Sequence, residues 1–147
     1  MDNPFKFLRD AEWQTLTANA EVKRFEPEQV LLESGQKPTG IMVVRSGTVN
    51  VCKGAAGFNL VVAEHGEGAI FGEMSFIESI PAEVSLIAAT PVEVLNITHA
   101  AVQTIIKDNP AFYGRFFQSL AYLLSRRLRE TTSRIGKQPA DDWLPED

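Results

Sequence analysis

The pattern of apolar and polar positions changes twice along the chain. Residues 4–20 carry apolar side chains at approximately helical spacing, which predicts a short helical lead. Residues 21–98 contain short alternating or apolar runs, such as GIMVVRSG, TVNVCK and VSLIAAT, that are typical of β-strands. Helical spacing returns over residues 99–135, first in HAAVQTIIKDNP and then in a long segment after Pro110. The expected order is therefore a helical lead, a strand region and C-terminal helices.

Glycines punctuate the strand region. Eight of the ten glycines lie between residues 35 and 72, where they separate the apolar runs. Turns repeated between short strands indicate antiparallel pairing in a sandwich or barrel. We predict a mainly β fold with flanking α-helices: an antiparallel β-barrel or jelly roll (double-stranded β-helix) with N-terminal helices and a long C-terminal helix. The expected domain covers residues 1–136, and the polar, proline-containing residues 137–147 are predicted to form a flexible acidic tail.

The long C-terminal helix carries an apolar stripe that is wider than the seam of a coiled coil. A stripe of this width predicts that one face of the helix covers the barrel and that another face meets a partner. We expect a homodimer or a partner protein to contact five of its residues: Phe116, Leu120, Leu123, Leu124 and Leu128. The basic run at residues 126–129 is interpreted as a solvated helix end, because cations near a helix C-terminus are favoured by the helix dipole.

Composition narrows the range of functions. A formal net charge of -5 and a pI near 5.1 argue against a protein that neutralises phosphate backbones, so we expect no nucleic-acid partner. The single cysteine, Cys52, cannot form an internal disulfide, which favours a reducing cytoplasm. No apolar run approaches the roughly 20 residues that cross a bilayer, so no membrane partner is expected. The two histidines, His65 and His99, form no metal-ligand motif, and we predict neither a metal, a cofactor nor an enzyme.

The segment AIFGEMSFIESIPAEVSLIAAT, residues 69–90, carries the candidate chemistry. Gly72 lets the backbone of a strand-to-helix turn approach a ligand, and the N–H groups around Met74 and Ser75 suit an anion at the start of a short helix. The Glu73 carboxylate can accept a hydrogen bond from a ribose hydroxyl. Alternatively, it satisfies donors at the start of the helix. We predict a ligand pocket that begins at Phe71.

Four stretches carry a resemblance to a known family: ESG at 33–35, RSGTV at 45–49, FGEMS at 71–75 and AATPVEVL at 88–95. Together with the order of elements, they resemble the cyclic nucleotide-binding domain family over nearly the whole chain. The resemblance implies that Glu73 contacts a ribose. It also implies that an arginine directly after the proline of this segment grips the cyclic phosphate. Here that position is Ala82, and the next residue, usually small or hydroxylic, is Glu83.

The resemblance implies a non-catalytic regulatory module that senses a small molecule, either a cyclic nucleotide or an altered ligand. Because the arginine is replaced and a carboxylate follows it, we expect binding of cyclic AMP or cyclic GMP to be weak or lost. Lys37, Arg45 and Lys53 on nearby loops are alternative phosphate partners. The alternative function is a ligand-free module for dimerisation or protein docking. Transcription factors of the family carry a DNA-binding module after the long helix, and the residues that follow 136 are too few to form one.

Overall fold

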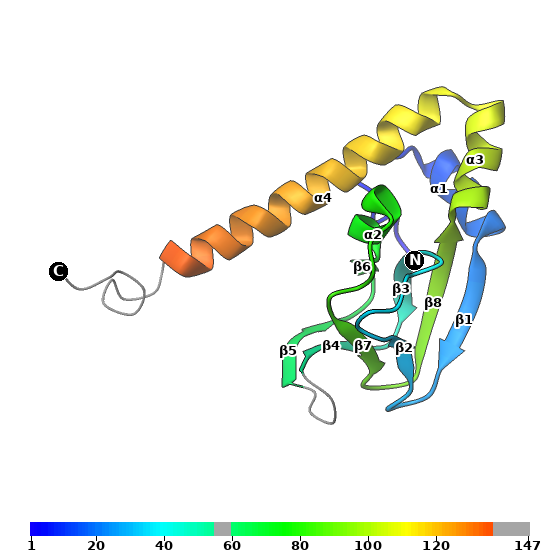
Figure 1. Ribbon diagram of the computed structural model, residues 1–147. Helices are drawn as coiled ribbons and strands as arrows, with labels where there is room; N and C mark the ends of the chain where they lie inside the picture. Colours follow the sequence, from blue (N-terminus) through cyan, green and yellow to red (C-terminus); the bar gives the residue numbers. More distant parts are fainter. Residues whose placement is uncertain (55–59, 137–147) are drawn as a thin grey trace.

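The computed structural model describes residues 1–54 and 60–136 (Figure 1). Its elements, in chain order, are α1 (Asp10–Asn19), β1 (Glu21–Phe25), β2 (Val30–Leu32), β3 (Gly40–Ser46), β4 (Val49–Lys53), β5 (Leu60–His65), β6 (Ile70–Phe71), α2 (Glu73–Glu78), β7 (Ser85–Ala88), β8 (Val92–Thr98), α3 (His99–Asp108) and α4 (Ala111–Gly136). The predicted fold class is confirmed: a strand region is flanked by helices and ends in a long C-terminal helix. The predicted acidic tail, 137–147, lies outside the described residues.

The strands form two four-stranded antiparallel sheets and not a closed barrel. Sheet A has the order β1-β8-β3-β6, and sheet B has the order β2-β7-β4-β5. In the middle of sheet A, β3 pairs with β8 from Gly40 opposite Thr98 to Val44 opposite Val94. The jelly-roll form of the prediction is therefore the correct one, because each sheet keeps two edge strands instead of closing on itself.

The central strand β3 is buried on both faces because it separates two apolar clusters. Ile41 and Val43 belong to the cluster that sheet A shares with the helices. Met42 and Val44 belong to the cluster between the two sheets. Successive side chains of a strand point to opposite faces, so a continuous apolar run can fill both clusters. Figure 1 shows α1, α3 and the first turns of α4 gathered at one end of the strands.

The N-terminal segment packs against the first part of α4. The ring of Phe5 lies 5.6 Å from that of Phe116, centroid to centroid, and the Phe7 N–H donates to Ser119 Oγ at 2.9 Å. We call residues 111–120 the proximal half of α4 and residues 121–136 its distal half. The distal half extends past α2 and away from the strands (Figure 1), over about 24 Å at 1.5 Å per residue. Within the described residues, no helix combines the length and apolarity needed to cross a membrane.

Candidate functional site

A pocket of about 280 Å³ lies between sheet B, α2 and α4. Leu32, Val51 and Leu86 of sheet B form one wall, and α2 together with the segment before β7 forms another. All seven residues predicted to contact a ligand line this pocket: Phe71, Gly72, Glu73, Met74, Ser75, Ala82 and Glu83. The structure therefore brings the two ends of the segment together at one cavity, and their contact with a ligand stays a prediction.

Gly72 makes the sharp turn from β6 into α2. Its φ of +86° lies in the left-handed region, and a Cβ atom at this position would lie 2.9 Å from the carbonyl oxygen of Gly40. Glycine avoids both the strain and the close contact. The Gly72 carbonyl oxygen then accepts a hydrogen bond from the Phe76 N–H at 2.9 Å, which closes the first turn of α2. The N–H groups of residues 73–75 precede this first helical hydrogen bond, as they do in any helix.

Glu73 places a buried carboxylate at the pocket, with 4% of its surface exposed. Its Oε1 accepts a hydrogen bond from Nη1 of Arg127 on α4, and Nη2 of the same guanidinium donates to the carbonyl oxygen of Ile70. Without such a partner, burial of the charged carboxylate would destabilise the folded state, because the loss of its hydration would not be compensated. The alternative expectation was that Glu73 accepts hydrogen bonds from the N–H groups at the start of α2. Among the described residues, its carboxylate accepts from Arg127 instead.

Arg127 is the pocket residue on α4 that the sequence analysis missed; the apolar wall of sheet B and His65 were not predicted to line the pocket either. The interpretation of residues 126–129 as a solvated helix end is wrong for Arg127, whose side chain lines the pocket and is 38% exposed. It fits Arg126, which is exposed and pairs with Glu130 at 3.6 Å. The missed signal was helical spacing: positions 116, 120, 123 and 127 fall on one face of the helix, and this is the face that is buried in the proximal half.

Ala82 and Glu83 lie beside the turn that follows β2. The Ala82 N–H donates to the Gln36 carbonyl oxygen at 2.9 Å, and the Ala82 carbonyl oxygen accepts from the Gly35 N–H at 2.8 Å. Ser34 Oγ donates to the Glu83 carbonyl oxygen at 3.3 Å. These bonds fix the backbone of the segment, so that the half-buried Ala82 side chain packs with the cluster between the sheets while Glu83 is exposed.

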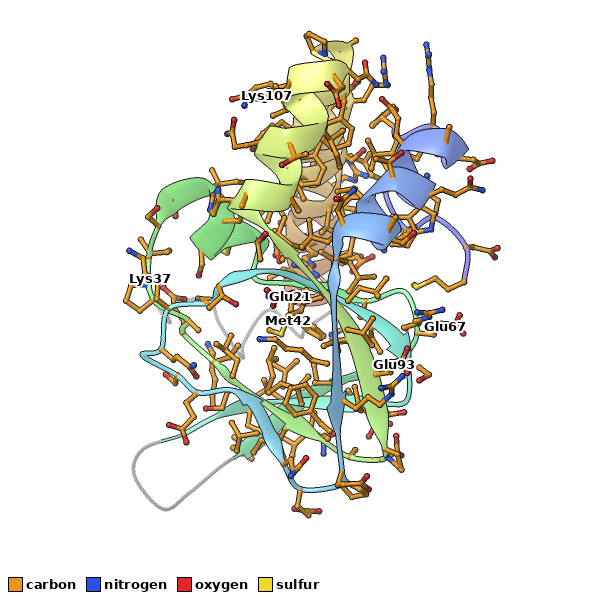
Figure 2. The ribbon with its side chains drawn as sticks, turned by 90° about the vertical axis from the view of Figure 1, so that its right-hand side faces the viewer. Glu21, Lys37, Met42, Glu67, Glu93 and Lys107 are labelled. Atoms are coloured by element: carbon orange, nitrogen blue, oxygen red, sulfur yellow. The ribbon has the colours of Figure 1, made fainter. Side chains whose placement is uncertain are left out.

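The three loop cations considered as alternative phosphate partners do not line the pocket in the described part of the chain. Arg45 pairs instead with Glu93 at 3.4 Å. Figure 2 shows Lys37 and Glu93, the partner of Arg45, on opposite sides of the molecule. The described lining thus contains two carboxylates, Glu73 and Glu83, a single guanidinium, that of Arg127, and the imidazole of His65.

The five helix residues predicted to meet a partner differ in burial. Phe116 and Leu120, at 0% and 1% exposure, lie in the cluster that α4 shares with the N-terminal segment and sheet A. The expectation that they form a partner surface is corrected, because the chain itself covers them. Leu123 and Leu124 are half-buried, and Leu128 is 68% exposed. Of the five predicted residues, the three in the distal half therefore remain accessible to a partner, and such a contact stays a prediction.

The histidines take part in aromatic contacts. His65 lines the pocket and meets the ring of Phe71 edge-on, with centroids 5.8 Å apart. His99, at the start of α3, stacks on Phe76 of α2 at 3.8 Å. In the part of the chain that the structure describes, no three His, Cys, Asp or Glu side chains gather as a metal site would require. Cys52 is buried and unpaired.

Comparisons with known proteins agree on one family. The model of the cyclic nucleotide-binding domain matches residues 22–109. A cyclic nucleotide-binding domain from Methylobacillus flagellatus has 26% sequence identity and a TM-score of 0.79, over 95% of this chain and 76% of that one. The c-di-GMP-responsive global regulator CLP of Xanthomonas campestris has 25% identity and a TM-score of 0.72, over 93% of this chain and 66% of the regulator.

The catabolite activator protein of Thermus thermophilus shares the fold, with 24% identity and a TM-score of 0.76 over 91% of this chain. The chain spans 62% of that protein's length. No curated protein sequence matches the chain.

Proposed function

The chain belongs to the cyclic nucleotide-binding domain family, and we propose that it is a non-catalytic sensor module whose pocket controls α4. The observation that carries the proposal is Arg127, the described residue through which α4 reaches the pocket and bonds to buried Glu73. A ligand that hydrogen-bonds to Glu73 competes with this guanidinium and shifts the distal half of the helix. Occupancy is thereby converted into a change of helix position that another chain can read.

We further propose that cyclic AMP and cyclic GMP bind weakly or not at all. Ala82 offers no cation where the family carries an arginine. Removal of one partner from a buried charge pair costs on the order of 2–5 kcal/mol, or roughly 30- to several-thousand-fold in affinity. Arg127 does not replace it, because the charge of its guanidinium is already balanced by the buried Glu73 carboxylate. CLP, which has a similar fold, is responsive to c-di-GMP, and this supports a change of ligand on the same scaffold.

Calorimetric titration with cyclic AMP and cyclic GMP tests the ligand part of the proposal. We expect no micromolar binding by the wild type. The Ala82→Arg, Glu83→Ser double variant should bind at least about 30-fold more tightly, because paired charge-assisted hydrogen bonds to the phosphate are restored. Arg126→Ala, which changes an exposed arginine outside the pocket, is the matched control and should titrate like the wild type. Micromolar binding by the wild type would overturn this part of the proposal.

We propose the cytoplasm as the setting of the module. Cys52 is the single cysteine of the sequence and is buried. The fold therefore uses no internal disulfide, which agrees with a reducing compartment.

A second candidate, a dimerisation or protein-docking module, is favoured by the exposure of Leu128 on the distal half of α4. Static light scattering tests the homodimer form of this candidate. If two copies pair through α4, Leu128→Glu should weaken association by at least about tenfold, because it puts a charge into an apolar contact. Leu60→Glu is the matched control: Leu60 is 69% exposed, close to the 68% of Leu128, but lies on β5. A wild-type monomer at every concentration would overturn the homodimer.

A further inference from the structure

The wall of the pocket along sheet B is apolar. Leu32 and Leu86 are 5% and 1% exposed, and Val51 packs against the same cluster. Ala82 and Val84 continue this surface along the segment before β7. A molecule seated here meets hydrocarbon groups of β2, β4 and β7, and His65 lies on β5 at the edge of the same sheet.

The charged groups of the pocket do not suit an anion. Among the described lining residues, two carboxylates stand against one guanidinium and one imidazole, that of His65. Both terminal nitrogens of Arg127 already donate hydrogen bonds, one to Glu73 and one to the Ile70 carbonyl oxygen. The Glu73 carboxylate thereby already balances the charge of this guanidinium. An anionic ligand would add a second negative charge to one cation beside apolar walls, and a buried charge without a partner of its own is strongly disfavoured.

A cation is no better matched to this pocket. The buried carboxylate, that of Glu73, is already paired with Arg127. The other, that of Glu83, belongs to an exposed residue, where water and salt screen its attraction. A cationic ligand would lose its hydration against the apolar wall and gain little in return.

We propose that the pocket binds an uncharged, largely apolar molecule, such as a small aromatic compound, with one hydrogen-bonding group directed to Glu73 and Arg127. The inference rests on the proposed sensor function, because it names the ligand class of the same pocket. A volume of about 280 Å³ lies close to the lower end of the roughly 300–1,000 Å³ of small-molecule pockets. Transfer of the ligand's apolar surface from water to the walls provides the driving force.

Two fluorescent probes that share one ring skeleton test the charge preference. N-phenyl-1-naphthylamine is uncharged, and 8-anilino-1-naphthalenesulfonate carries the same rings with an added sulfonate. We expect the wild-type pocket to bind the uncharged probe at least about tenfold more tightly, because the guanidinium in the described lining is already paired with Glu73 and the sulfonate would lose its hydration beside apolar walls. Ala82→Arg, which supplies a cation beside the pocket, should reduce or reverse this preference.

Two further variants test whether the fluorescence of the uncharged probe arises from binding in the pocket. Ala63 is a half-buried lining residue on β5, and Ala63→Phe places a ring in the cavity. This variant should weaken binding of the uncharged probe by at least about tenfold, because the ring and the probe compete for the same volume. Leu128→Ser removes an exposed apolar side chain outside the pocket and should leave the signal unchanged. Circular dichroism of each variant verifies that the fold is retained.

The outcomes separate the ligand class from the sensor function. The inference is supported if the uncharged probe binds the wild type, if Ala63→Phe weakens this binding, and if Leu128→Ser leaves it unchanged. Equal or tighter binding of the sulfonate probe in the wild-type pocket overturns the inference and leaves the sensor function in place. Absence of binding by either probe also overturns it. Uncharged-probe binding that leaves amide exchange in α4 unchanged supports the ligand class but contradicts the proposed control of the helix.

Discussion

At the residue scale, the carboxylate of Glu12 joins α1 to the corner between α3 and α4. Its Oε1 accepts hydrogen bonds from the Arg9 N–H at 3.0 Å and from Arg115 Nε at 2.8 Å. Its Oε2 accepts from Asn109 Nδ2 at 3.0 Å and from Arg115 Nη2 at 2.6 Å. The hydrogen-bonded guanidinium of Arg115 lowers the pKa of Glu12 from 4.5 to about 2, and the carboxylate in turn raises the pKa of Arg115.

This cluster predicts a specific acid dependence of stability. The folded state holds the pKa of Glu12 below its unfolded value. Its contribution is therefore complete above about pH 4.5 and is lost as the pH falls toward 2. Glu12→Gln keeps the shape of the side chain but removes the charge, and should lower the free energy of unfolding at neutral pH by about 1–3 kcal/mol. Urea unfolding at a series of pH values measures the difference, which should shrink across that interval.

Glu130→Gln is the matched control for Glu12→Gln. The Glu130 side chain is 55% exposed and faces Arg126 in a pair one helical turn apart, so its removal should change stability by at most about 0.5 kcal/mol. A difference between Glu12→Gln and wild type that stays constant from neutral pH to about pH 2 would contradict the role assigned to this carboxylate.

At the scale of elements, Arg127 ties the distal half of α4 to the turn between β6 and α2. Arg127→Ala removes the hydrogen bonds to Glu73 and to the Ile70 carbonyl. We expect faster amide hydrogen exchange in α2 and over residues 121–133, because local opening no longer has to break these contacts. Arg126→Ala, one position away on the exposed face, should leave exchange in α2 unchanged. Equal exchange in the two variants would show that Arg127 does not couple these helices.

The same helix illustrates what could be predicted from the sequence. Period-two runs, glycines and helical spacing are local signals, and they were sufficient for the order of strands and helices and for the jelly-roll class. Which surface covers each face of α4 depends instead on contacts distant along the chain, such as the bond between Phe7 and Ser119, 112 positions apart. For this reason Phe116 was wrongly predicted to contact a partner, and Arg127 was wrongly predicted to face solvent. The segment that lines the pocket was found through its resemblance to a family and through the chemistry of Gly72.

At the scale of the whole molecule, the first residues of the chain and the proximal half of α4 close the same apolar cluster. Phe5 is 2% exposed, and its ring lies 5.8 Å from that of Trp13 and 5.6 Å from that of Phe116. The cluster also contains Ile41 and Ile97 of the central strands of sheet A. Because one continuous cluster connects the N-terminal segment, sheet A and α4, these parts should unfold together.

Phe5→Ala tests this cooperativity. Loss of a buried aromatic ring leaves a cavity, so the free energy of unfolding should fall by about 3–5 kcal/mol. Phe7→Ala changes a half-buried ring in the same segment and should cost less, since water already reaches part of it. With Trp143→Phe in every sample, Trp13 fluorescence reports on the cluster and far-UV circular dichroism on all helices and strands. Coincident urea transitions are expected for a single cooperative unit. A fluorescence transition at lower urea than the dichroism transition would instead mean that the N-terminal segment detaches first, and that α4 loses its cover before the sheets unfold.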